Sequence, residues 1–138
     1  MPRATASGFL LSKTHFKLIN SVTMANFSIE NKKGYSVITM TTDQLDAQTT
    51  PELRSELVLL SGAQVKNMIL DMSACKHCDT NGLSAILIGH RLCKDGNLIL
   101  AGVSPEVETI LSIQKFDPPL MILGDREEAE ARMASLTI

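Results

Sequence analysis

Aromatic residues and excess basic charge are both scarce in this chain of 138 residues. It has no Trp, one Tyr and four Phe, and its formal net charge is −2 at pH 7. Nucleic-acid-binding proteins usually present a basic surface, and those that bind single strands also need aromatic platforms for base stacking. No apolar run reaches the roughly 20 residues that span a bilayer. We therefore expect a soluble protein that neither binds nucleic acid nor inserts into a membrane.

Cysteine is also scarce, with only Cys75, Cys78 and Cys93 present. A chain of this length can build its core without disulfides, so we expect free thiols and a cytoplasmic location. The C-x-x-C pair Cys75–Cys78 allows a redox pair or, with His90 and Cys93, a zinc site. Both cysteines of the pair precede the expected helix, however, and His90 lies about three helical turns further on. We favour buried packing roles for all three thiols and expect no metal and no cofactor.

The first 23 residues differ from the rest because they contain no Asp or Glu. Short apolar pieces there alternate with Ser, Thr and a few basic residues. This composition predicts a disordered leader or a misassigned start that precedes Met24, and a targeting leader is the alternative. A single domain is expected over residues 24–138.

Strand-like and helix-like apolar patterns alternate through this domain. The strands are expected at residues 27–29, 35–40, 65–72, 98–101 and 120–123. The helices are expected to begin at Thr50, at Asp79 or Thr80, at Ser104 and at Asp125. A turn at 31–34 makes the first two strands a hairpin. The order β-β-α-β-α-β-α-β-α predicts an α/β fold, with a small mixed sheet of about five strands and about four helices.

Two loops should meet at the carboxyl ends of the strands, where open α/β sheets bind ligands and partners. They span residues 41–51 and 73–82, so Asp46 and the segment Asp79-Thr80-Asn81 are expected to be neighbours. Asp79, Thr80 and Asn81 are all residues that cap helices, and Gly82 allows another backbone to approach closely. The chain has no glycine-rich phosphate loop and no strained nucleophile turn, so we do not expect an enzyme.

Four segments together resemble the STAS domain, the family of bacterial anti-sigma-factor antagonists, which also occurs on sulfate transporters. They are residues 45–54, 69–73, 79–87 and 98–105. The resemblance covers about Phe27 to Leu136 and implies a small mixed sheet with helices. It also implies a non-enzymatic, cytoplasmic protein that binds an anti-sigma serine kinase and so frees a sigma factor in transcription regulation. The implied binding and switch loop contains Asp46, Asp79, Thr80, Asn81 and Gly82.

The sequence departs from the family at the switch itself. In the antagonists, the residue directly before the glycine is a serine that the kinase phosphorylates, and the added charge releases the partner. That position is Asn81 here, and an amide cannot accept a phosphate. Three outcomes stay open: a permanently unphosphorylated-like binder, a displaced phosphosite at Thr80, or a different protein-binding role.

Two other functions also stay open. STAS-like chains serve as small subunits of membrane transport assemblies, so a soluble subunit of an ABC-type lipid transporter is the main alternative. A thiol-disulfide protein that uses Cys75 and Cys78 is a weaker one.

Overall fold

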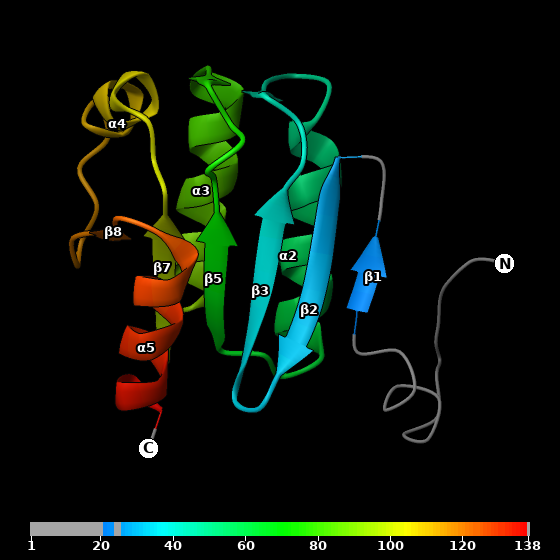
Figure 1. Cartoon of the computed structure of the whole chain (residues 1–138). Helices are drawn as coiled ribbons and strands as arrows, with labels where there is room; N and C mark the ends of the chain where they lie inside the picture. Colours follow the sequence, from blue (N-terminus) through cyan, green and yellow to red (C-terminus); the bar gives the residue numbers. More distant parts are fainter. Residues whose placement is uncertain (1–20, 24–25, 138) are drawn as a thin grey trace, which may run out of the picture.

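The chain forms one mixed sheet with helices on both of its faces (Figure 1). The computed structural model describes residues 21–23 and 26–137. The strands lie in the order β1-β2-β3-β5-β7-β8, and the labels follow Figure 1. Their bounds are β1 Ser21–Thr23, β2 Phe27–Lys32, β3 Tyr35–Met40, β5 Asn67–Asp71, β7 Asn97–Ala101 and β8 Met121–Leu123. β1, β2 and β3 pair antiparallel, whereas β3, β5, β7 and β8 run parallel.

This order confirms the predicted α/β class and the predicted alternation of strands and helices. One strand was not expected: β1 pairs with β2 through Val22 and Ile29, although we assigned residues 21–23 to a leader. The sheet therefore begins before the expected boundary. Three consecutive β-compatible residues are too few to give a periodic signal. The rest of that leader, residues 1–20, lies outside the described residues.

Four helices occur in the described residues: α2 Thr50–Gly62, α3 Thr80–Leu92, α4 Pro105–Leu111 and α5 Arg126–Leu136. α2 and α3 pack against each other on one face of the sheet, and α5 covers part of the opposite face beside β5, β7 and β8 (Figure 1). Asp79, Ser104 and Asp125 cap α3, α4 and α5 as predicted, each through its side-chain oxygen. No helix in this part of the chain is long and apolar enough to cross a membrane.

The predicted start of α2 is wrong by one residue. Thr49 occupies the N-cap position and Thr50 is already helical. Thr50 is buried on the same helix face as Leu53 and Leu57, and its hydroxyl has no hydrogen-bond partner in the described part of the chain. Core packing therefore decides the role of Thr50, whereas its capping propensity misled the sequence-based assignment.

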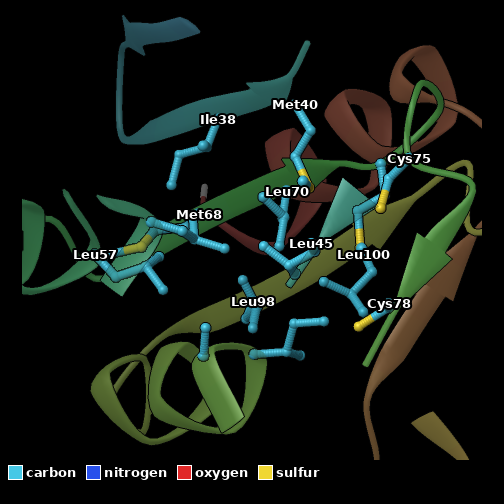
Figure 2. Close-up of a cluster of buried hydrophobic side chains, with 14 of the residues drawn as sticks. Ile38, Met40, Leu45, Leu57, Met68, Leu70, Cys75, Cys78, Leu98 and Leu100 are labelled. Carbon is cyan, nitrogen blue, oxygen red and sulfur yellow. The ribbon is translucent and has the colours of Figure 1, made fainter. Parts of the chain in front are cut away.

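The main core fills the space between the sheet and the layer formed by α2 and α3. Figure 2 shows Ile38, Met40, Met68, Leu70, Leu98 and Leu100 from three adjacent strands converging there. The alternate residues Val37, Ile69 and Ile99 face α5, where Ala129 and Met133 cover them. The central strands are thus buried on both faces, as their continuous apolar runs predicted. Each fully buried aliphatic side chain contributes about 1.5–3 kcal/mol of transfer free energy.

Candidate protein-binding site

A two-residue parallel ladder ties together the two loops at the carboxyl end of the sheet. β4 (Gln44–Leu45) pairs with β6 (His77–Cys78), with Leu45 opposite Cys78. The backbone N–H of Asp79 then donates to the Leu45 carbonyl at 3.2 Å. Asp46 and Asp79 therefore follow directly from paired residues, which confirms that these two loops are neighbours. The ladder was not predicted from the sequence, because a two-residue strand has no measurable periodicity.

The carboxylate of Asp79 holds the first turn of α3. Its Oδ1 accepts hydrogen bonds from the backbone N–H of Asn81 at 2.9 Å and of Gly82 at 3.1 Å. These N–H groups have no acceptor inside a helix, so the side chain supplies one. Asp79 Oδ2 has only a long contact of 3.5 Å with the Asn81 side-chain amide. One carboxylate oxygen therefore fixes the helix start, and the other remains available at the surface.

Asp46 closes the neighbouring loop in a similar way. Its Oδ1 accepts from the backbone N–H of Gln48 at 3.0 Å and of Thr49 at 3.2 Å. The Thr49 hydroxyl in turn accepts from the Asp46 N–H at 3.0 Å. Asp46 Oδ2 accepts no hydrogen bond from the described residues. Asp46 and Asp79 thus each use one oxygen internally and can offer the second to a partner.

Gly82 lies in the first turn of α3, where that turn presses against the β4–β6 ladder. A Cβ added at Gly82 would lie 2.7 Å from both the Cys78 Sγ and the Leu45 carbonyl oxygen. The Leu45 carbonyl cannot move without disturbing the ladder, because it also accepts from the Asp79 N–H. The close approach predicted from the sequence is therefore real, and Gly82 acts by its small size in supporting the loop.

Thr80 and Asn81 are the exposed residues of this first turn. The Thr80 hydroxyl makes no hydrogen bond to another described residue, so it is accessible to a partner or a modifying enzyme. The Asn81 amide is tethered only by its long contact with Asp79. Together with Asp46, Asp79 and Gly82, these residues make up what we call the switch-loop surface.

The three thiols are buried in the core, and that of Cys78 packs beneath Gly82 of the switch-loop surface. Cys75, Cys78 and Cys93 are free and buried. Burial raises the pKa of all three, to about 12 for Cys78 and to about 11 for Cys93. The Cys75 thiol donates to the His77 carbonyl at 3.3 Å. A redox thiol needs a lowered pKa and access to solvent, so this environment suits packing and disfavours thiol-disulfide chemistry.

His77 and His90, the two histidines in the part of the chain that the structure describes, do not join the cysteines in a shared site. His90 Nε2 contacts the Pro118 carbonyl oxygen at 2.7 Å, and its ring meets Phe116 edge to face. His77 is exposed and contacts Glu106 at 2.9 Å, and that carboxylate raises the pKa of His77. Across the residues that the structure describes, no group of Cys, His, Asp and Glu side chains has the arrangement of a metal site.

The opposite, amino end of the sheet has a different character, which the sequence analysis missed. A hollow of about 520 Å³ lies there between the ends of α2 and α3, and Lys66, Arg91 and Lys94 contribute to its lining. Gln64, at this same end, is exposed and has a positive φ of 71°. Three basic side chains thus gather at the amino end beside a single carboxylate, that of Asp95, whereas the switch-loop surface carries two carboxylates.

A family model described as STAS domain matches residues 26–129. A solved anti-sigma-factor antagonist (STAS) domain protein from Planctomyces limnophilus is 19% identical, with a TM-score of 0.70 over 80% of this chain and 99% of that one. The Bacillus cell fate determinant SpoIIAA in its phosphorylated form is 22% identical, with a TM-score of 0.63 over 77% and 97%. An anti-sigma factor antagonist from Mycobacterium paratuberculosis is 16% identical, with a TM-score of 0.69 over 78% and 92%. Sequence comparison with curated proteins finds no match.

Proposed function

Because the chain belongs to the STAS domain family, we propose that it is a regulatory binding module whose switch-loop surface docks onto an anti-sigma serine kinase. The observation that carries this proposal is the β4–β6 ladder, which joins the two loops in one surface. Asp46 and Asp79 stand at its edge and Thr80 and Asn81 are exposed on it. The structural neighbours that are anti-sigma-factor antagonists support the choice of partner class.

The free oxygens of the two carboxylates require hydrogen-bond donors on the partner. Asp46 and Asp79 each keep one oxygen in an internal hydrogen-bond set, so their positions are fixed before binding. A fixed acceptor loses little side-chain entropy when a donor approaches. We therefore expect backbone N–H groups, Lys or Arg of the partner to meet this surface, with an association that weakens as salt increases.

Asn81 sets the regulatory state of the module. Its side chain is neutral and has no hydroxyl, so phosphorylation cannot give it the charge that releases an antagonist from its kinase. The module is thus held in a binding-competent state, unlike a protein such as SpoIIAA, for which a phosphorylated form has been solved. Thr80 has an accessible hydroxyl one residue earlier and is the residue of this turn that could accept a phosphate.

Affinity capture with matched variants tests the proposal. The immobilised wild-type chain is compared with Asn81→Asp and with Gln64→Glu in extracts of the source cell, and the retained proteins are identified by mass spectrometry. Both substitutions exchange an amide for a carboxylate at an exposed position, but Gln64 lies at the opposite end of the sheet. We expect Asn81→Asp to lose a kinase that the wild type and Gln64→Glu retain.

Three results would contradict parts of this proposal. Equal capture by Asn81→Asp and wild type would show that the switch-loop surface is not the interface. Retention of membrane transporter subunits in place of a kinase would favour the alternative role in a transport assembly. Phosphate on Thr80 in the wild-type chain, read from the same mass spectra, would show that the switch is displaced and that the module is not constitutive.

A further inference from the structure

Asn81 cannot be phosphorylated, but its side-chain amide can react with the backbone that follows it. It is the only Asn in the chain that is followed by Gly. Because glycine has no Cβ, the backbone nitrogen that follows Asn81 is sterically accessible to the side-chain amide of Asn81. Asn-Gly pairs are for this reason the dipeptides most prone to spontaneous deamidation.

We propose that Asn81 is a deamidation site, that the carboxylate of Asp79 restrains the reaction, and that the product carries the negative charge that releases the partner. The regulatory part of this inference rests on the proposed function, whereas the chemical part does not. The reaction would act as a slow, one-way switch in place of reversible phosphorylation.

The reaction is balanced and needs only water. The Gly82 backbone nitrogen attacks Cγ of Asn81 and loses its proton, the bond from Cγ to the side-chain nitrogen breaks, and ammonia leaves. Water then opens the resulting succinimide ring at one of its two carbonyl carbons. Opening gives aspartate or isoaspartate at position 81, each with one new negative charge.

The structure identifies what restrains this attack. The Gly82 nitrogen is the nucleophile, and its N–H donates to Asp79 Oδ1 at 3.1 Å. The Asn81 N–H donates to the same oxygen at 2.9 Å, so the carboxylate holds both residues in the helical turn, and ring closure requires them to leave it. Both groups lie in the first helical turn, where no backbone carbonyl of the helix is available. Their restraint therefore depends on the Asp79 side chain, together with the close packing of Gly82 against Leu45.

Solvent has access to the reacting group. The Asn81 side chain is exposed, so water can open the ring and ammonia can leave. An aspartate at position 81 would lie in the first turn of α3, where the helix dipole favours negative charge. The fold therefore tolerates the aspartate product, and the new charge would change binding more than it changes stability.

The rate is measured on the purified full chain during prolonged incubation at mildly alkaline pH. Trypsin releases the peptide His77–Arg91, in which Asn81 is the only amide side chain, so the mass change is assigned without ambiguity. The variants are Asp79→Ala, which loses the acceptor, and Asp79→Ser, which keeps a capping oxygen. Asn81→Gln is the control for the site, and the urea-unfolded wild type gives the unrestrained rate.

We expect the unfolded chain to react fastest and the folded wild type most slowly. Asp79→Ala should react about fivefold faster than the wild type, the factor that corresponds to about 1 kcal/mol of lost capping. Asp79→Ser should stay near the wild type. Equal rates for Asp79→Ala and wild type would refute the restraint by Asp79, and a folded chain without any deamidation at Asn81 would refute the site.

The regulatory consequence is tested separately on the aged protein. The deamidated and unreacted fractions are separated by charge, and each is used to capture the partner. We expect only the unreacted fraction to retain it, and equal retention would overturn the switch. If neither fraction retains any partner, the proposed function fails, whereas the rates measured on the isolated chain still decide the chemistry.

Discussion

Two of the helices that begin at the carboxyl end of the sheet, α2 and α3, start in different ways. α3 depends on one side chain, because Asp79 accepts hydrogen bonds from two N–H groups of the first turn. α2 has no side-chain cap: Thr49 makes no such bond, and Pro51 in the first turn has no N–H to satisfy. Asp46 instead accepts from residues before the helix and closes the loop.

This difference gives the start of α3 a possible role in switching and the start of α2 a purely structural one. The start of α3 is held by an exposed carboxylate that a partner can also contact, so binding and local helix stability are coupled through Asp79. The start of α2 is held by the fixed φ of proline and by the burial of Thr50 and Leu53. Changes at the start of α3 should therefore affect both stability and binding. Changes at the start of α2 should affect mainly stability.

The largest expected effect comes from Gly82→Ala, which would push a methyl group into the β4–β6 ladder. We expect a loss of about 2–4 kcal/mol in the free energy of unfolding, because the clash involves backbone. Gly62→Ala, at the end of α2, is the matched control, since nothing lies within 4 Å of its added Cβ. That variant should gain about 0.5–1 kcal/mol. Urea denaturation measures both, and equal changes would show that Gly82 is not packed as described.

Removal of the α3 cap should have the next largest effect. Asp79→Ala is expected to cost about 1 kcal/mol, because two N–H groups of the first turn lose their acceptor. Asp79→Ser should recover most of that loss, since a serine hydroxyl caps well. The comparison uses chemical denaturation together with helix-specific circular dichroism. If both variants lose the same stability, the charge of Asp79 matters and its hydrogen bonds do not.

Asp46→Ala should destabilise the protein less than Asp79→Ala. Its carboxylate accepts from Gln48 and Thr49, which lie in a partly exposed loop where water can replace it. A loss of about 0.5 kcal/mol is the expected result in the same denaturation assay. A larger loss than that of Asp79→Ala would reverse the comparison and make α2 the less securely held helix.

The last prediction concerns the buried thiols, which we expect to react only slowly in the folded protein. In the folded protein Cys78 has a pKa of about 12, raised from 9.0, so its neutral thiol persists to higher pH than in the unfolded chain. The stability that this shift contributes is complete below pH 9.0 and is lost as the pH rises toward about 12. At mildly alkaline pH, iodoacetamide should therefore alkylate the unfolded chain and spare the folded one. Rapid alkylation of folded Cys75 or Cys78 would revive the thiol-disulfide alternative.

The sequence carried enough information for most of the fold. Continuous apolar runs predicted the buried strands β5 and β7. The capping side chains of Asp79, Ser104 and Asp125 predicted the starts of three helices. Thr50 misled the assignment, because capping propensity is a local property and the burial of Thr50 is decided by tertiary contacts. β1 was missed because its strand is too short to leave a pattern.

The candidate site was likewise predicted only in part. That Asp46 would lie near Asp79 followed from the rule that parallel strands end at one edge of a sheet. The β4–β6 ladder did not follow, because it pairs two loops that are far apart in the sequence. The use of a single oxygen of each carboxylate did not follow either, because it depends on the local geometry of each turn. The roles of Thr80 and Asn81 in binding stay predictions.

The central claim is that the switch-loop surface contacts the partner, and site-specific photo-crosslinking in the source cell tests it most directly. A photoreactive amino acid is placed at Thr80, which is exposed in the first turn of α3, or at Gln64, which is exposed at the opposite end of the sheet. We predict one discrete crosslinked product, containing a kinase, from position 80 and none from position 64. A product from position 64 alone would contradict this claim and would place the interface at the opposite, basic end of the sheet.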